Sequence, residues 1–380
     1  MSSPLLDLPG AVPAPEDAVD VGVPWHFGDP FAEQRSAARG AVLVDRSHRE
    51  VIAVPGEERL SWLHLVLSQH LTELPDGQGT EALVLDSSGR VDCHMLVAHH
   101  EDVVYLDADR GAQATSPLPT IGVDGKQSLF DYLEGMRFFS KVEPREATSE
   151  LAVLTAVGPD AGGVLAGFAE VPSAPYEVRG LPGGGFVRNV PFRSLPTYDL
   201  LVPRESLVDW WLALTDAGIR PSGTMAYEAL RVEALRPRVG LDTDDRAIPH
   251  ELGWVHTAAH VAKGCYRGQE TVAKVHNVGK PPRRMILLHL DGSVEVTPEP
   301  GDPVLQGERR VGRVGSVVQH HELGPIALAL LKRSTPVEAE LMAGDPEEGR
   351  AVAAAVDPDS VPPDSGEPPG RVAADRVRGR

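Results

Sequence analysis

Residues 259–277 read AHVAKGCYRGQETVAKVHN and contain Cys265, one of only two cysteines in the chain. Lys263 and Arg267 flank this cysteine, and Gly268 is a suitable N-cap for a helix over the following residues QETVAKV. Cys265 would then lie in a glycine-rich loop before the positive end of a helix, where nearby cations also favour a thiolate over a thiol. A small buried side chain that fills a gap in the core is the alternative. The loop by itself leaves both interpretations open.

The composition excludes several classes of partner. The 380 residues carry a formal net charge of −19, so a general attraction to nucleic acid or anionic lipid is not expected. No apolar run is long enough to span a bilayer, and the acidic, proline-rich N-terminus lacks the basic start of a signal peptide. Two widely separated cysteines do not make a disulfide framework. We therefore expect a cytoplasmic protein with no direct nucleic-acid or membrane partner.

Hydropathy patterns indicate folded units between two polar ends. Residues 1–21 and 344–380 are rich in Pro and Asp and poor in aromatic side chains, so we predict that both segments are disordered. Strand-like alternation and helical spacing mark the first elements, namely strands over 49–54, 81–86, 91–98 and 103–107 and a helix over 57–69. A similar order of strands and helices follows from residue 151, which indicates a duplicated module.

These elements predict an α+β fold with two related mixed α/β domains and a C-terminal β-barrel. The predicted limits are 22–145 with 225–280 for the first domain, 146–224 for the second and 281–343 for the barrel. Gly312 and Gly315 interrupt a predicted barrel strand, and glycines at such positions indicate bulges.

Two histidines precede the cysteine at a spacing that zinc ligands also use. His256 and His260 are four residues apart and would share one face of a helix. No glutamate follows the first histidine and no second pair of ligands appears, so we predict no metal site.

The octapeptide KGCYRGQE resembles the signature of the YgfZ-type folate-binding proteins, which are relatives of the glycine-cleavage T-protein, an aminomethyltransferase. Four other stretches are similar to that superfamily in the same order, namely GDPFAEQRSAARGAVLVDRSHREVIAVPGEERLSWLHLVLSQHLTEL, GQGTEALVLDSSGRV, RFFSKVEP and LRVEALRPRVGLDTDDRAIPHELG. The resemblance covers about residues 22–335. It implies that the two α+β domains are folate-binding domains and form, with the barrel, a three-part ring around a central channel.

The resemblance also implies tetrahydrofolate, or a derivative, as the cofactor. Asp199 resembles the position of the T-protein's pterin-binding glutamate, and a carboxylate can accept the adjacent N–H donors of a pterin in a fork. Arg49, Tyr227 and Arg231 resemble further ligand-lining positions. A surface ion pair is the alternative for the charged ones, and an exposed position at a strand edge is the alternative for Asp199. Around Cys265, the resemblance assigns supporting roles to the other motif residues, Lys263, Gly264, Tyr266, Arg267, Gly268, Gln269 and Glu270.

One departure from the T-protein concerns catalysis. The T-protein carries paired aspartates after its hairpin, one of them its key catalytic acid, and Cys93 and His94 occupy the matching positions here. Asp92 is one residue away and would point to the opposite face of the strand from Cys93. The replacement argues against aminomethyl transfer and leaves open whether the protein is an enzyme.

The first hypothesis from the sequence is therefore a folate-binding protein in which Cys265 is the functional thiol. The resemblance implies a role in iron–sulfur cluster assembly or maintenance, with indirect effects on tRNA modification. Iron–sulfur proteins would be its partners, and we expect a monomer. A tetrahydrofolate-dependent aminomethyltransferase or methyltransferase is the second hypothesis. A folate store or sensor with an inert Cys265 is the third.

Overall fold

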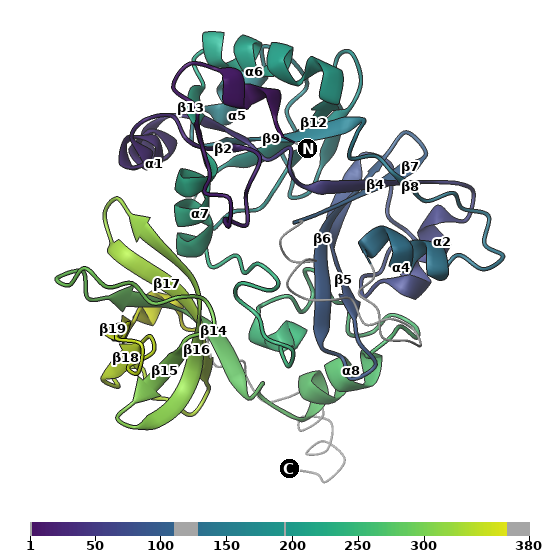
Figure 1. Ribbon diagram of the computed structural model, residues 1–380. Coiled ribbons are helices and arrows are strands. Elements are labelled where there is room, and N and C mark those ends of the chain that lie inside the picture. The colour runs from purple at the N-terminus through teal and green to yellow at the C-terminus, as the bar shows by residue number, and fades with distance from the viewer. Residues whose placement is uncertain (1, 110–127, 194, 363–380) are drawn as a thin grey trace.

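The computed structural model describes residues 2–109, 128–193 and 195–362. Two mixed α/β units and a barrel surround the long loops that follow α7 (Thr224–Glu233), as Figure 1 shows. The predicted fold class is confirmed. Among the described helices, none combines the length and the apolar character that a membrane crossing requires.

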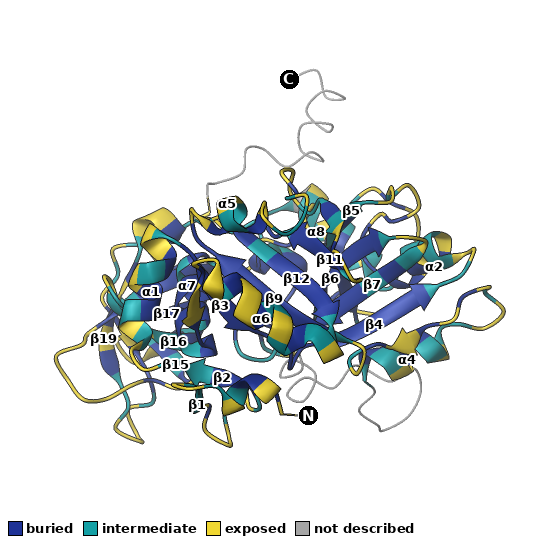
Figure 2. Ribbon diagram, turned by 90° about the horizontal axis from the view of Figure 1, so that it is seen from above, coloured by how far each residue is buried: buried dark blue, intermediate teal, exposed yellow. Residues whose placement is uncertain are grey.

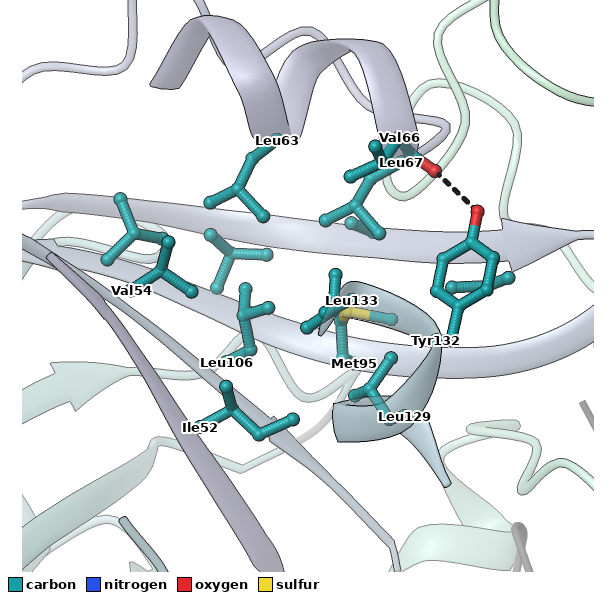
Figure 3. Close-up of a cluster of buried hydrophobic side chains, with 14 of the residues drawn as sticks. Ile52, Val54, Leu63, Val66, Leu67, Met95, Leu106, Leu129, Tyr132 and Leu133 are labelled. Atoms are coloured by element: carbon teal, nitrogen blue, oxygen red, sulfur yellow. Dashed lines mark hydrogen bonds between the residues drawn. The ribbon is translucent and has the colours of Figure 1, made fainter. Parts of the chain in front are cut away.

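The first sheet has the strand order β5-β6-β7-β4-β8. Its strands are β4 (Glu50–Pro55), β5 (Gln78–Leu85), β6 (Val91–His100), β7 (Val103–Ala108) and β8 (Arg145–Glu146). Two helices, α2 (Arg59–Val66) and α4 (Leu129–Gly135), cover one face. Leu63, Met95 and Leu133 belong to the core between them, and Tyr132 Oη donates to the Val66 carbonyl at 3.2 Å (Figure 3). The strands and the helix expected in this region are confirmed.

The second sheet has the order β10-β11-β12-β9-β3-β13. Its strands are β3 (Val42–Asp45), β9 (Leu151–Val157), β10 (Val178–Gly180), β11 (Phe186–Asn189), β12 (Thr197–Pro203) and β13 (Arg220–Ser222). Its helices are α1 (Pro30–Arg39), α5 (Ala161–Leu165) and α6 (Leu207–Asp216), with the 3-10 turn η2 (Arg204–Ser206). Against the other face, Val153 and Phe186 meet Val51 of the first sheet.

Strand β3 joins the second sheet although it precedes the first sheet in the chain. It pairs antiparallel with β9 and parallel with β13. All four residues of β3 are buried, and Figure 2 shows the strand deep between helices. A strand that is apolar on both faces requires cover on both, and an inner position in the second sheet provides it. The predicted assignment of 22–145 to the first domain is therefore wrong for this strand.

The barrel is closed by six strands in the order β14-β17-β16-β15-β18-β19. They are β14 (Arg283–Leu290), β15 (Pro303–Gln306), β16 (Arg309–His320), β17 (Gly324–Lys332), β18 (Leu341–Ala343) and β19 (Val352–Val356), followed by η4 (Pro358–Ser360). The register shifts between Val314 and Val317, which confirms a bulge beside Gly315.

The predicted end of the barrel at residue 343 is wrong because β19 is needed to close it. Val352, Ala354 and Val356 point inward while the residues between them are exposed, so a strand pattern was present within the acidic tail. Residues 363–380 of the predicted disordered tail lie outside the described residues.

The N-terminal segment is ordered, so the prediction of disorder over residues 2–21 is wrong. It contains η1 (Pro4–Asp7) and β1 (Val12–Pro13), which pairs with β2 (Pro24–His26). Leu5 is completely buried against the second sheet's core, and Ser3 Oγ donates to Asp45 Oδ2 at 2.5 Å. A few anchoring side chains hold this segment, which its average composition did not reveal.

Candidate functional site

The octapeptide KGCYRGQE is pressed against the hairpin between β5 and β6. Helix α8 (Gln269–Val278) begins after Gly268, which confirms the predicted N-cap. Gly268 has a φ of +80°, and a Cβ there would lie 2.6 Å from Gly89 Cα and 2.7 Å from the Asp86 carbonyl oxygen. Only glycine combines this left-handed backbone with so close an approach.

Lys263 fixes the loop to the end of helix α2. Its buried ammonium group donates to the carbonyls of His64, Leu67 and Gln69, the last two at 2.5 and 3.0 Å. These carbonyls lie at or beyond the C-terminal turn of α2, where backbone acceptors lack partners within the helix. Because an ammonium has three N–H donors, none remains for a thiolate at Cys265. This differs from the predicted stabilisation of that thiolate by Lys263.

The neighbouring motif residues also serve the fold. Tyr266 is buried in one apolar cluster with Trp254, and its Oη donates to the His260 carbonyl at 3.3 Å. Gln269 Nε2 donates to the Lys263 carbonyl at 2.9 Å. Cys265, by contrast, is exposed, so the interpretation of this cysteine as a buried packing residue is wrong. Gly264 and Glu270 are also exposed.

The two histidines before the motif do not share a helix face. His256 lies in a turn with a φ of +74°, and His260 follows in irregular backbone. Their i,i+4 spacing therefore does not place the two side chains on one face of a helix.

Arg267 and Asp92 carry opposite charges and interact electrostatically, but no ion pair between them occurs among the described residues. Asp92 Oδ2 and Arg267 Nη1 are both buried without a hydrogen-bond partner there. Burial, with a contribution from the Asp86 carboxylate, raises the pKa of Asp92 to about 7, although Arg267 acts in the opposite direction. The ionised form of Asp92 is therefore disfavoured in the folded protein, and its charge becomes destabilising as the pH rises above about 7.

Replacing Asp92 with asparagine is expected to stabilise the protein at pH 8 and to change little at pH 5. The raised pKa means that the folded state holds this proton more tightly than the unfolded state. Stability is therefore lost as the pH rises from about 4 through 7. We expect a gain of about 1–2 kcal/mol at pH 8, measured by urea unfolding at both values. The exposed Asp216→Asn is the control, and an equal effect of Asp92→Asn at both pH values would contradict the prediction.

A cavity of about 510 Å³ lies where β5 and β6 face the loops that follow α7. Its lining includes Trp254, Phe192 and Tyr176 as aromatic walls and Arg236 and Arg193 as cations. Residues 252–254, 257 and 234–237 complete much of the wall, close to η3 (Pro249–Glu251).

Glu81 and His94 form a polar pair in this cavity. His94 Nε2 lies 2.7 Å from Glu81 Oε2, and its ring stacks on Trp254 with 4.6 Å between centroids and 6° between planes. Glu81 Oε1 accepts from Tyr176 Oη at 2.6 Å and from Arg236 Nη2 at 2.8 Å. Although burial opposes it, Arg236 and the hydrogen bond from His94 hold the pKa of Glu81 well below its usual value.

Cys93 lies on the other face of β6. It is completely buried in the first core, and burial raises the pKa of its thiol. Of the two residues at the T-protein's aspartate positions, only His94 lines the cavity.

Three of the four residues expected to bind folate belong to one buried charge network. Arg49 Nε donates to Asp107 at 2.9 Å, and Arg188 Nη2 donates to Asp107 at 2.9 Å and to Asp199 at 2.8 Å. Arg46 lies 4.3 Å above the Tyr227 ring and 3.8 Å from Asp199. This network joins the two sheets at the centre of the molecule.

The fourth residue, Arg231, joins α7 to the barrel. It donates to both oxygens of Glu228, to Asp242, to Ser316 and to the Arg236 carbonyl. Every N–H of its guanidinium is thereby engaged within the protein. None of the four predicted residues is among those that line the cavity. Tyr227 comes near it, since its ring centroid is 6.0 Å from that of Phe192.

Sequence patterns alone did not identify four residues of this site, namely Glu81, Trp254, Arg236 and Phe192. One signal was available: Glu81 sits in GTEALVL, a strand with apolar residues on both sides, so a buried carboxylate with a partner was implied. Nothing local marked the other three, because they approach Glu81 from distant parts of the chain.

Comparisons with known proteins agree with this architecture. A family model described as the GCVT N-terminal domain matches residues 17–260, and one described as the CAF17 C-terminal beta-barrel domain matches residues 283–363. An aminomethyltransferase of Nostoc sp. is 26% identical over 337 residues, which cover 84% of this chain and 85% of the relative. The Streptomyces coelicolor aminomethyltransferase is 25% identical over 321 residues, or 81% of this chain and 82% of the relative.

A crystal structure of the glycine cleavage system aminomethyltransferase T from Bartonella henselae has the same fold. Its TM-score is 0.78 at 18% identity, with 93% of this chain and 94% of that chain covered. The chain therefore belongs to the GCVT family, in the YgfZ/CAF17 form that couples a GCVT N-terminal domain to a CAF17-type C-terminal barrel.

Proposed function

We propose that this protein binds tetrahydrofolate in the cavity beside Trp254 and uses Cys265 as a functional thiol in iron–sulfur cluster assembly or maintenance. The observation that carries the proposal is the contrast within the octapeptide. Lys263, Tyr266 and Gly268 are fixed by contacts with distant segments, whereas Cys265 is exposed. The motif is thus a rigid support that presents a single thiol to solvent.

The cavity has the properties that a reduced folate requires. Its volume of about 510 Å³ lies within the usual range for small-molecule sites. Phe192 offers an aromatic face for a pterin, Trp254 supports the His94 ring in the same wall, and Arg193 and Arg236 offer positive charge for the glutamate tail. Arg49, Asp199, Tyr227 and Arg231 would then act behind the cavity wall and hold its shape.

The cavity and the thiol belong to one continuous segment. Residues 252–254 and 257 line the cavity, and Cys265 follows Thr257 by eight residues. Trp254 and Tyr266 belong to the same apolar cluster, so a ligand in the cavity that Trp254 lines would act on the anchor beside Cys265. This connection gives folate a route by which it regulates the thiol.

An exposed thiol suits a transient role. It can act as a temporary cluster ligand or take part in thiol exchange without a preformed metal site. Iron–sulfur proteins would be the partners, and cluster-dependent tRNA-modifying enzymes would be affected indirectly. We place this activity in the cytoplasm and assign it to the monomer.

Iodoacetamide labelling tests the proposal. We expect Cys265 to react readily because it is exposed, and Cys93 to stay unlabelled in the folded chain because it is completely buried. Saturating tetrahydrofolate should slow the labelling of Cys265 several-fold. Mass spectrometry measures the labelling rate at each pH of a series. Cys93→Ser is the control and should behave as the wild type. Labelling of Cys265 that ignores folate would instead favour a folate store with an inert cysteine.

Aminomethyl transfer remains the second candidate because Glu81 brings a carboxylate into the cavity. Both of its oxygens already accept hydrogen bonds, from His94 on one side and from Tyr176 and Arg236 on the other. The Glu81 carboxylate therefore has little remaining capacity to accept hydrogen bonds from the amine of an aminomethyl donor. Tetrahydrofolate-dependent ammonia release from an aminomethylated carrier would establish this activity.

A further inference from the structure

We propose that Glu81 and His94 form a base-positioning pair: Glu81 fixes the tautomer of His94, whose Nδ1 accepts an N–H group of a planar heterocycle in the cavity. The proposal rests on the proposed folate site for the identity of that heterocycle. Its geometry depends only on the residues of the cavity wall.

The tautomer follows from the partner of Nε2. Glu81 is ionised and accepts hydrogen bonds only, and its Oε2 lies 2.7 Å from His94 Nε2. In a neutral imidazole the single proton must then sit on Nε2, which leaves a lone pair on Nδ1. No hydrogen bond to Nδ1 occurs among the described residues, while 14% of the side chain is exposed in the cavity. Nδ1 is therefore a free acceptor.

The strand register builds this pair. His94 on β6 lies opposite Leu83 on β5, and Glu81 is two residues further along the same face of β5. Such diagonal neighbours lie within reach of long side chains. Trp254 stacks on the imidazole with nearly parallel planes, so the ring has a fixed plane and its Nδ1 lone pair a fixed direction.

Two further residues keep the carboxylate ionised and in place. Tyr176 Oη and Arg236 Nη2 both donate to Glu81 Oε1, so Oε2 is left for His94. Tyr176 precedes β10 and Arg236 follows α7, so three separate parts of the chain converge on one buried carboxylate.

The arrangement supports a simple proton transfer. The ligand N–H bond breaks as a bond forms between that proton and His94 Nδ1, and the electron pair stays on the ligand nitrogen. The imidazolium that results keeps its Nε2–H bond to the Glu81 carboxylate, which balances its charge. No atom changes its oxidation state.

Nitrogen-15 NMR of the full chain tests the tautomer directly. We expect the neutral Nε2–H form for His94, and a change of its Nδ1 resonance when tetrahydrofolate is added. Glu81→Gln should disturb this tautomer, because a glutamine can turn its NH₂ group towards Nε2. The Nδ1–H tautomer in the wild type would overturn the inference even if folate binds.

Binding measurements separate the inference from the proposed function. Fluorescence titration with tetrahydrofolate should show about tenfold weaker binding for His94→Leu, as expected for one lost hydrogen bond. His100→Leu on the same strand is the control and should bind as the wild type, because His100 does not line the cavity. Unchanged binding by His94→Leu, with the fold verified by circular dichroism, overturns the inference and leaves the folate site standing. Absence of binding by the wild type overturns the proposed function, and with it the ligand assigned here.

Discussion

Replacing Gly268 with alanine is expected to destabilise the protein by about 2–4 kcal/mol, because two penalties coincide. The backbone of Gly268 is left-handed, and the new Cβ would lie 2.6 Å from Gly89 Cα and 2.7 Å from the Asp86 carbonyl oxygen. Both neighbours are backbone atoms of a tight hairpin, so neither can rotate away. The whole start of α8 would have to move off the β5–β6 hairpin. Urea unfolding monitored by circular dichroism measures the loss.

Gly264→Ala in the same octapeptide is the matched control. An added Cβ at Gly264 meets nothing within 4 Å, and its φ is not left-handed. We expect this variant to lie within about 0.5 kcal/mol of the wild type. If the two substitutions lower the free energy of unfolding equally, the close contact between Gly268 and Gly89 is not the reason that position 268 requires glycine.

Replacing Arg188 with methionine should cost about 3–5 kcal/mol, which is enough to prevent folding in a marginally stable chain. Arg188 is completely buried and joins Asp107 of the first sheet to Asp199 of the second. Methionine fills similar space but leaves two buried carboxylates short of a counter-charge. The yield of soluble protein and the urea midpoint measure the effect.

Arg179→Met on the adjacent strand β10 is the control for loss of charge. Arg179 pairs with Glu177 and Glu170 at a site where a third of its side chain is exposed, so we expect a change below about 1 kcal/mol. Adding Asp199→Asn to Arg188→Met should restore part of the stability, because it removes one uncompensated charge. If the double variant is no better than Arg188→Met, the charge argument is wrong.

Local structure was predictable from the sequence where side-chain periodicity determines it. The alternation over 91–98 predicted β6, Gly268 predicted the start of α8, and Gly315 predicted the barrel's bulge. Sheet membership was not predictable in this way. β3 has the same apolar character as its neighbours in the chain, and only its long-range pairing with β9 places it in the second sheet.

In the candidate site, too, local features were predictable from the sequence and long-range contacts were not. The octapeptide identified Cys265 as the residue of interest, but the role of Lys263 depends on carbonyls of α2 that lie almost 200 positions earlier, such as that of His64. Likewise, Glu81 and His94 are close in sequence, whereas Trp254 and Arg236 reach them only because the whole chain folds. Contacts of this kind carry no local pattern.

The inner position of β3 has a consequence for synthesis on the ribosome. Val42 pairs with Val157 on one side and with Arg220 on the other, so both partners emerge long after β3 itself. At 5–20 residues per second, β3 waits on the order of 10–40 s before its sheet is complete. During that time the apolar residues Val42, Leu43 and Val44 are exposed to other nascent chains. Slower growth at low temperature and co-expressed chaperones that cover β3 should therefore raise the yield of soluble protein.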